Sequence, residues 1–145
     1  MYKFEKKGKK NICLMGLMGS GKSIIGRKLA NDMKFSFFDI DEEIVNSTKK
    51  SINAIFKENG EDYFRKIEEE VCLKYLDFKE SIISLGGGSI LSSKVRKMMK
   101  LHSYSIYLKV EISILNDRLK SSKKRPLLKN EKIKNKLEEI YKARK

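Results

Sequence analysis

The chain contains a glycine-rich segment of the kind that binds phosphate groups. Residues 16–23 read Gly-Leu-Met-Gly-Ser-Gly-Lys-Ser, which is Gly, any four residues, then Gly-Lys-Ser. Glycine lets a loop turn its backbone N–H groups inward without clashes from a Cβ atom. A lysine can bridge the outer phosphates, and a serine hydroxyl can reach Mg²⁺. The pattern predicts a nucleotide-binding loop, with contacts expected from Gly19, Ser20, Gly21, Lys22, Ser23 and Ile24.

Two carboxylates end the second apolar segment of the chain. Asp39 and Asp41 are separated by Ile40, and side chains on a strand alternate between its faces, so the two acids could have separate roles. Parallel sheets bind their ligands at the carboxyl ends of the strands. We expect one carboxylate to face a metal ion and the other to face the molecule that accepts the phosphate.

Arg65 and Glu68 lie in a segment with the period of an amphipathic helix, residues 61–78. Residues three apart share a helix face, so the acid could hold the guanidinium in place. A guanidinium held in this way can bind a carboxylate through two parallel hydrogen bonds. The alternative is an ordinary ion pair on the surface of the helix.

Two further segments could complete a site for a small acceptor molecule. Gly86, Gly87 and Gly88 follow an apolar run and expose bare backbone, which lets a small polyol approach closely. The basic, polar stretch at residues 120–131 contains Arg125, directly before the only proline of the chain. Such a loop could act as a lid that brings an arginine onto a phosphate in transfer.

Apolar and amphipathic segments alternate along the chain. Four short apolar runs predict strands, at residues 11–17, 35–40, 81–85 and 104–110. Helical spacing predicts a helix after the glycine loop and further helices at residues 42–49, 51–59, 61–78, 92–101, 113–119 and 131–143. The alternation implies a single α/β domain, residues 1–145, in which helices cover both faces of a parallel sheet.

The composition of the chain narrows the classes of function. Two cysteines and one histidine in 145 residues predict buried thiols, no disulfide framework and no histidine-based metal site. No apolar run approaches the roughly 20 residues of a membrane-spanning helix, so we expect a cytoplasmic protein with no membrane partner. The net charge of +14 comes from lysines spread over every segment, so we expect no nucleic-acid partner.

Taken together, these segments resemble the shikimate kinase family. The resemblance rests on five motifs that occur in one order along nearly the whole chain: the glycine loop, Asp39-Ile40-Asp41, residues 60–68, Ser84-Leu85-Gly86-Gly87-Gly88 and Arg125-Pro126-Leu127-Leu128. It implies a three-layer α/β/α P-loop kinase fold and a monomer. It also implies transfer of the ATP γ-phosphate to the 3-hydroxyl of shikimate, with Mg²⁺, in the pathway to chorismate and the aromatic amino acids.

The resemblance implies roles for single residues. Lys22 and Arg125 would stabilise the phosphoryl group in transfer. Ser23 would bind Mg²⁺, and Asp39 would support the ion through water. Asp41 would hold the ring hydroxyls and is the candidate base. Arg65 and Arg144 would bind the shikimate carboxylate, and Gly86, Gly87 and Gly88 would lie beside the ring hydroxyls. Phe56 would pack against the face of the ring, and Arg118 would stack on the adenine.

The chain ends earlier than the family pattern does. Shikimate kinases usually continue beyond the substrate arginine with a strand, an adenine-flanking loop and a closing helix, whereas Arg144 is the penultimate residue here. We therefore expect a fold that lacks its last strand and its C-terminal helix. A missing edge strand would uncover apolar surface, which predicts low stability or poor solubility.

Two other functions stay open at this point. A related P-loop kinase for gluconate or a nucleoside monophosphate would share the glycine loop and the lid, although Arg65 and the three glycines argue against it. A weakly active nucleotide- or nucleic-acid-binding module would explain the excess of lysine and the early chain end. Binding of a polyanion by such a module would fall steeply as salt is added.

Overall fold

The computed structural model describes residues 9–120, and a parallel sheet forms the centre of this part. β1 (Asn11–Met15) lies between β3 (Ser81–Ser84) and β4 (Ser103–Tyr107), and β2 (Ser36–Asp39) lies outside β3. Asn11 pairs with Ser81 on one side and with Ser103 on the other. All pairings are parallel, as expected for strands that helices separate in the sequence.

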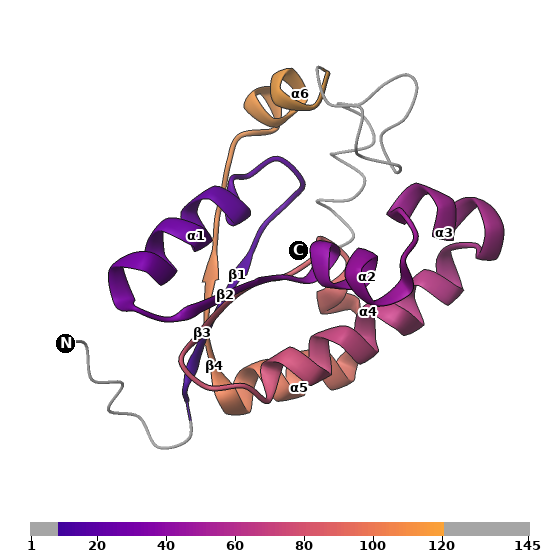
Figure 1. Ribbon diagram of the computed structural model, residues 1–145. Helices are drawn as coiled ribbons and strands as arrows, with labels where there is room; N and C mark the ends of the chain where they lie inside the picture. The colour runs from indigo at the N-terminus through magenta and orange to yellow at the C-terminus, as the bar shows by residue number, and fades with distance from the viewer. Residues whose placement is uncertain (1–8, 121–145) are drawn as a thin grey trace.

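Helices cover both faces of the sheet (Figure 1). α1 (Lys22–Met33) covers one face, where Ile12 belongs to a core that includes Ala30 of the helix. α4 (Glu61–Leu76) and α5 (Ser93–His102) cover the other face, where Cys13 belongs to a second core. Neighbouring residues of β1 enter opposite cores because side chains alternate along a strand. The predicted three-layer α/β/α fold is confirmed.

The other helices lie toward the end of the sheet where the strands finish (Figure 1). α2 (Ile40–Thr48) follows β2 directly, and α3 (Ile52–Asn59) packs against α4. A short 3₁₀ helix, η1 (Ser89–Leu91), follows the three consecutive glycines, and α6 (Ile112–Lys120) follows β4. The lid at residues 120–131 and the helix at residues 131–143 stay predictions, because residues 121–145 lie outside the described part.

Local capping moves the start of one helix away from the position that apolar spacing predicted and agrees with the prediction at another. α2 begins at Ile40 rather than at residue 42, because the Asp39 side chain accepts hydrogen bonds from the amides of Asp41 and Glu42. This cap also ends β2 at Asp39. Ser51 caps α3 by accepting from the amide of Ala54, as predicted.

Two helices end on lysines whose backbone is in the left-handed region. Lys34 follows α1 with φ 57°, and Lys49 follows α2 with φ 59°. The N–H group of each donates to carbonyl groups of the last helical turn. Glycine is the usual residue here, since a Cβ atom raises the energy of this conformation by about 1 kcal/mol.

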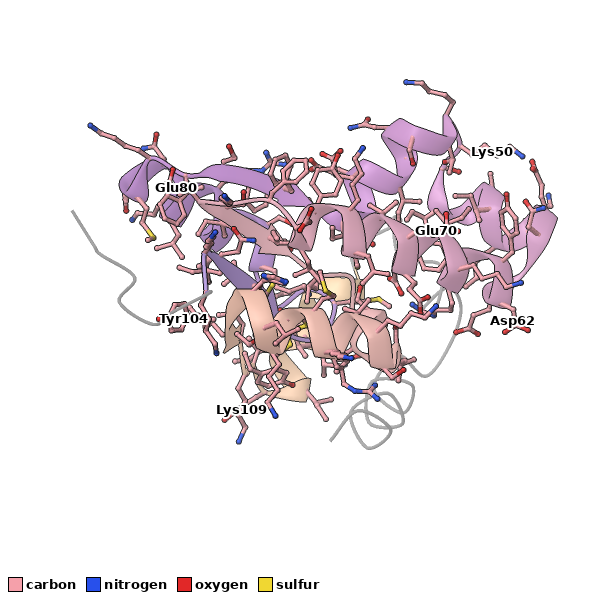
Figure 2. The ribbon with its side chains drawn as sticks, turned by 90° about the horizontal axis from the view of Figure 1, so that it is seen from below. Lys50, Asp62, Glu70, Glu80, Tyr104 and Lys109 are labelled. Carbon is pink, nitrogen blue, oxygen red and sulfur yellow. The ribbon has the colours of Figure 1, made fainter. Side chains whose placement is uncertain are left out.

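The candidate site lies at one end of the molecule. Figure 2 shows Glu80 and Tyr104, each beside the start of a strand, at one end, and Lys50 and Asp62, near α3 and α4, at the other. The second end holds the candidate site.

The predicted buried thiols are confirmed. Cys13 and Cys72 are both fully buried and free of disulfide bonds. Burial raises the pKa of the Cys13 thiol to about 11 and that of Cys72 to about 12, so both stay protonated at neutral pH. Within residues 9–120, no helix is both long and apolar enough to cross a membrane.

Candidate active site

The loop between β1 and α1 has the backbone that the glycine pattern predicted. Gly21 precedes the first turn of α1 with φ 95°, a conformation that other residues rarely adopt. Gly16 has no room for a side chain, because a Cβ atom would lie 2.7 Å from Oγ of Ser20 and 2.8 Å from the carbonyl oxygen of Leu108. The loop thus leads directly to the N-terminus of α1, where unpaired N–H groups attract anions.

Lys22 folds back over this loop. Its Nζ atom donates to the carbonyl oxygens of Gly16, at 2.9 Å, and of Leu17, at 3.2 Å. The oxygens of a phosphate share its negative charge, and each would be a stronger hydrogen-bond partner for the ammonium group than a neutral carbonyl oxygen. The ammonium group therefore lies where it could bind a nucleotide phosphate in place of these carbonyl oxygens.

Asp39 ties the end of β2 to the start of α1. Its Oδ1 atom accepts from the amides of Asp41, at 3.0 Å, and Glu42, at 3.4 Å, while its other oxygen accepts from the Ser23 hydroxyl. This network brings the serine hydroxyl and a carboxylate into contact, and Mg²⁺ prefers such oxygen ligands. Residues 9–120 contain no group of three or more His, Cys, Asp or Glu side chains that could hold a metal ion by themselves.

Arg65 is held between two carboxylates of its own helix. Its Nη1 atom lies 2.7 Å from Oε1 of Glu68, and its Nη2 atom lies 3.3 Å from Oε1 of Glu61. The Glu68 side chain is only 3% exposed, whereas that of Glu61 is 57% exposed. The guanidinium also lies over the Phe64 ring, 5.3 Å from its centroid. These contacts confirm that the arginine and Glu68 share a helix face, as predicted.

The consecutive glycines make room for these charged groups. A Cβ atom on Gly86 would lie 2.6 Å from Oε2 of Glu68 and 3.0 Å from Oδ1 of Asp41. A Cβ atom on Gly88 would overlap the guanidinium of Arg65. At Gly86 and Gly88 the groups nearest to such a Cβ atom are side chains of the protein itself, and the close approach of a polyol stays a prediction.

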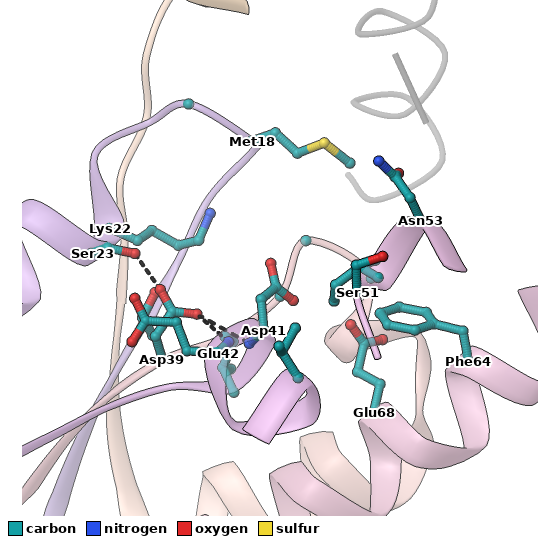
Figure 3. A pocket seen from close by; sticks show the side chains of 18 of the residues that line it. Met18, Lys22, Ser23, Asp39, Asp41, Glu42, Ser51, Asn53, Phe64 and Glu68 are labelled. Carbon is teal, nitrogen blue, oxygen red and sulfur yellow. Dashed lines mark hydrogen bonds between the residues drawn. The ribbon is translucent and has the colours of Figure 1, made fainter. Parts of the chain in front are cut away.

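One cavity of about 900 Å³ joins these parts. Lys22, Asp41 and Arg65 all line it, although they come from α1, α2 and α4. Figure 3 shows Lys22 and Asp41 directed toward the same space, with Phe64 and Glu68 on the opposite wall. The other predicted site residues that line it are Gly19, Gly21, Ser23, Ile24, Asp39, Phe56, Gly86, Gly87 and Gly88.

Two predicted site residues within the described part, Ser20 and Arg118, do not line this cavity. Ser20 is 5% exposed, and its hydroxyl is buried without a hydrogen-bond partner among the described residues. Arg118 of α6 instead touches the glycine loop, where its Nη1 atom donates to the carbonyl oxygen of Gly19 at 2.8 Å. Arg125 and Arg144 lie outside the described residues.

Several lining residues were not assigned to the site from the sequence. They come from the glycine loop, from α2 to α4 and from the end of β3, and they are Met18, Glu42, Val45, Asn46, Ser51, Ile52, Asn53, Phe64, Ser84 and Leu85. Met18 and Asn53 face each other across the mouth of the cavity (Figure 3). Their place in the sequence could have indicated the residues of α2 and α3, because both helices follow the carboxyl end of β2 and parallel sheets bind ligands at the carboxyl ends of their strands.

Comparison with known proteins identifies the family. The family model described as shikimate kinase matches residues 18–145. The chain belongs to the shikimate kinase family. A shikimate kinase from Persephonella marina is 39% identical over 136 residues, which cover 94% of this chain and 82% of that protein. One from Mesorhizobium japonicum is 37% identical over 123 residues, which cover 85% of this chain and 61% of that protein.

Solved structures of shikimate kinases share the fold. The shikimate kinase from Acinetobacter baumannii, solved in complex with shikimate, matches with a TM-score of 0.90 and 34% identity. The match covers 94% of this chain and 76% of that one. A gluconokinase from Sinorhizobium meliloti matches with a TM-score of 0.61 and 17% identity, which shows a shared fold alone.

These comparisons settle the broader predictions. The shikimate kinase family and its P-loop kinase fold are confirmed. The chain spans between about three fifths and four fifths of the length of the curated shikimate kinases described above, 61% of one and 82% of the other. The roles of single residues stay predictions.

Proposed function

We propose that this chain transfers the γ-phosphate of ATP to the 3-hydroxyl of shikimate, in the pathway to chorismate and the aromatic amino acids. The observation that carries the proposal is the shared cavity lined by Lys22, Asp41 and Arg65. The ammonium group of Lys22 and the guanidinium of Arg65 both line this cavity, and they would bind a phosphate and a carboxylate respectively. Membership of the shikimate kinase family supports the same reaction.

At the donor end, the glycine loop would hold the phosphates of ATP. Lys22 would exchange the carbonyl oxygens of Gly16 and Leu17 for oxygens of the β- and γ-phosphates. Ser23 and Asp39, already in contact, would hold Mg²⁺, directly and through water respectively. When bound, the ion would neutralise part of the negative charge of the phosphates.

At the acceptor end, Arg65 would bind the carboxylate of shikimate. Its guanidinium is held by Glu68 on one side, so it need not be ordered when the substrate binds. Phe56 and Phe64 pack with ring centroids 4.7 Å apart and would offer an apolar wall to the ring of the substrate. Gly86, Gly87 and Gly88 would face the hydroxyls.

The chemical step requires position and charge neutralisation more than covalent catalysis. The 3-hydroxyl oxygen of shikimate would bond to the γ-phosphorus as the bond from that phosphorus to the ADP oxygen breaks. The hydroxyl proton would pass to the Asp41 carboxylate, which would also orient the hydroxyl before transfer. Lys22 would stabilise the charge on the phosphoryl oxygens.

Arginines complete the proposed site. Arg125 would join Lys22 on the transferring phosphoryl group, and Arg144 would join Arg65 on the carboxylate. Both assignments rest on the resemblance, as does the assignment of Arg118 to adenine. The hydrogen bond of Arg118 to Gly19 supports this last role only by placing the guanidinium beside the glycine loop. A monomeric state and a cytoplasmic location also stay predictions.

A substrate panel tests this proposal against its alternatives. Purified protein with ATP and Mg²⁺ should release ADP when shikimate is added, and gluconate and nucleoside monophosphates should give only the background rate. Release with gluconate or a nucleoside monophosphate, but not with shikimate, would overturn the assignment. A rate with shikimate that is insensitive to added salt would also exclude a polyanion-binding module, whose affinity falls steeply with salt.

A further inference from the structure

The segment that carries the glycines of the acceptor end is stabilised by its own short turns. The amide of Ser89 donates to the carbonyl oxygen of Gly86, at 3.0 Å, and the amide of Leu91 donates to that of Gly88, also at 3.0 Å. The second of these bonds, together with the bond from the amide of Ser92 to the carbonyl oxygen of Ser89 at 3.2 Å, forms η1, which has only three residues. Such 3₁₀ turns have poor hydrogen-bond geometry, and glycine has the largest conformational freedom, so the segment needs support from its surroundings.

α4 supports this segment from one side. The thiol of Cys72 donates to Oγ of Ser89 at 3.4 Å, and the hydroxyl of Ser92 donates to Oε2 of Glu69 at 2.6 Å. Gly88 lies against Arg65 of the same helix. The position of the glycines relative to Arg65 therefore depends on how firmly η1 is held.

Arg96 of α5 holds η1 from the other side. Its Nη1 atom donates to the carbonyl oxygen of Ile90, at 2.6 Å, and to that of Leu91, at 3.1 Å. These two carbonyl groups end η1, where a helix leaves acceptors without partners of its own. The residue is exposed and does not line the cavity, so it can act on the site only through η1.

We propose that Arg96 is a positioning residue for the acceptor. By binding both terminal carbonyl groups of η1, it holds Gly86 and Gly88 against Glu68 and Arg65, so the acceptor pocket is formed before the substrate arrives. This inference rests on the proposed function. The nucleotide end has no such dependence, since the glycine loop from Gly16 to Ser23 is carried by β1 and α1.

Steady-state kinetics of the full chain test the role of Arg96. Arg96→Ala should raise the KM for shikimate roughly fivefold, because a small displacement of a binding group weakens the oriented complex, and should leave the KM for ATP unchanged. Arg96→Lys keeps one donor and should fall between the wild type and the alanine variant. Lys97→Ala is the matched control, because it removes the same charge from an exposed neighbour on α5.

Other kinetic results would overturn the proposal. The role is contradicted if the KM for shikimate is unchanged in Arg96→Ala, if both KM values rise equally, or if Lys97→Ala has the same effect. If Arg96→Ala does not fold, the same comparison is made with Arg96→Lys, for which an unchanged KM for shikimate is the contradicting result.

Hydrogen exchange tests the same contact without any turnover. The amides of Ser89 and Leu91 should exchange faster in Arg96→Ala than in the wild type, whereas those of β1 should not change. Unchanged exchange at both amides would contradict the proposal even if kinetics differ. A wild-type chain that shows no turnover with shikimate, but in which this exchange difference is found, would instead refute the proposed function and retain the contact of Arg96 with η1.

Discussion

The proposed donor end of the cavity comes mainly from one continuous stretch of chain, to which the end of β2 adds Asp39, whereas the proposed acceptor end is assembled from separate elements. Residues 16–23 supply the loop and Lys22 within a single strand-to-helix connection. The acceptor end combines Asp41 of α2, Arg65 of α4 and the glycines before η1. A local site of the first kind depends on its own residues, whereas one of the second kind depends on how helices pack.

The largest effect is expected from Lys22→Ala. Removal of the cation that would neutralise the transferring phosphoryl group should lower kcat on the order of a hundredfold or more. Lys22 is partly exposed at a helix start, so the variant should still fold. Turnover with saturating ATP and shikimate measures the effect, and thermal unfolding serves as the control for folding. A kcat within about threefold of wild type would exclude the proposed role.

A smaller and more selective effect is expected from Arg65→Ala. Loss of charge-assisted hydrogen bonds to the shikimate carboxylate should raise the KM for shikimate about ten- to a hundredfold. The KM for ATP should stay unchanged, because Arg65 belongs to the acceptor end. Measurement of both constants separates the two ends. Equal changes in the KM for shikimate and the KM for ATP would contradict the assignment of Arg65 to the acceptor end alone.

Gly88→Ala should act through Arg65. The new Cβ atom would overlap the guanidinium, which can move because it is the end of a flexible side chain. We therefore expect little loss of stability but a rise of about tenfold or less in the KM for shikimate, since the binding group is displaced. The double variant with Arg65→Ala is the decisive control. If Gly88→Ala still raises KM when Arg65 is absent, the displacement of the arginine is not the cause.

The smallest effect is expected on stability, from a substitution at the end of α2, the helix that carries Asp41. Lys49 ends α2 in the left-handed conformation, so Lys49→Gly should increase the free energy of unfolding by about 0.5–1 kcal/mol. For a chain of this size that corresponds to a Tm higher by roughly 2–4 °C, measured by thermal unfolding. Lys66→Gly, in the exposed interior of α4, should lower the Tm instead. A decrease in Tm for Lys49→Gly would contradict this explanation.

The same contrast explains what the sequence could predict. The glycine loop was predicted from eight consecutive residues, because every group proposed to bind phosphate there, in the backbone of residues 16–23 and the side chains of Lys22 and Ser23, belongs to one short segment. The spacing of Arg65 and Glu68 predicted their contact, since three residues nearly complete one helical turn.

The contacts that the sequence did not predict depend on packing between distant segments of the chain. No local pattern shows that Gly86 lies against Glu68 and Asp41, or that Arg96 reaches two carbonyl groups of η1. A lone arginine in the first turn of a helix has no specific signature. The start of α2 was predicted two residues late, because the Asp39 cap, and not apolar spacing, determines it.

The most direct test of the account is ³¹P NMR of the reaction that the full chain carries out on ATP, Mg²⁺ and shikimate. The account predicts that ADP and one phosphate monoester on the 3-hydroxyl of shikimate appear together in equal amounts. Formation of ADP with inorganic phosphate alone, or no change in the ATP signals over the course of the reaction, would contradict it.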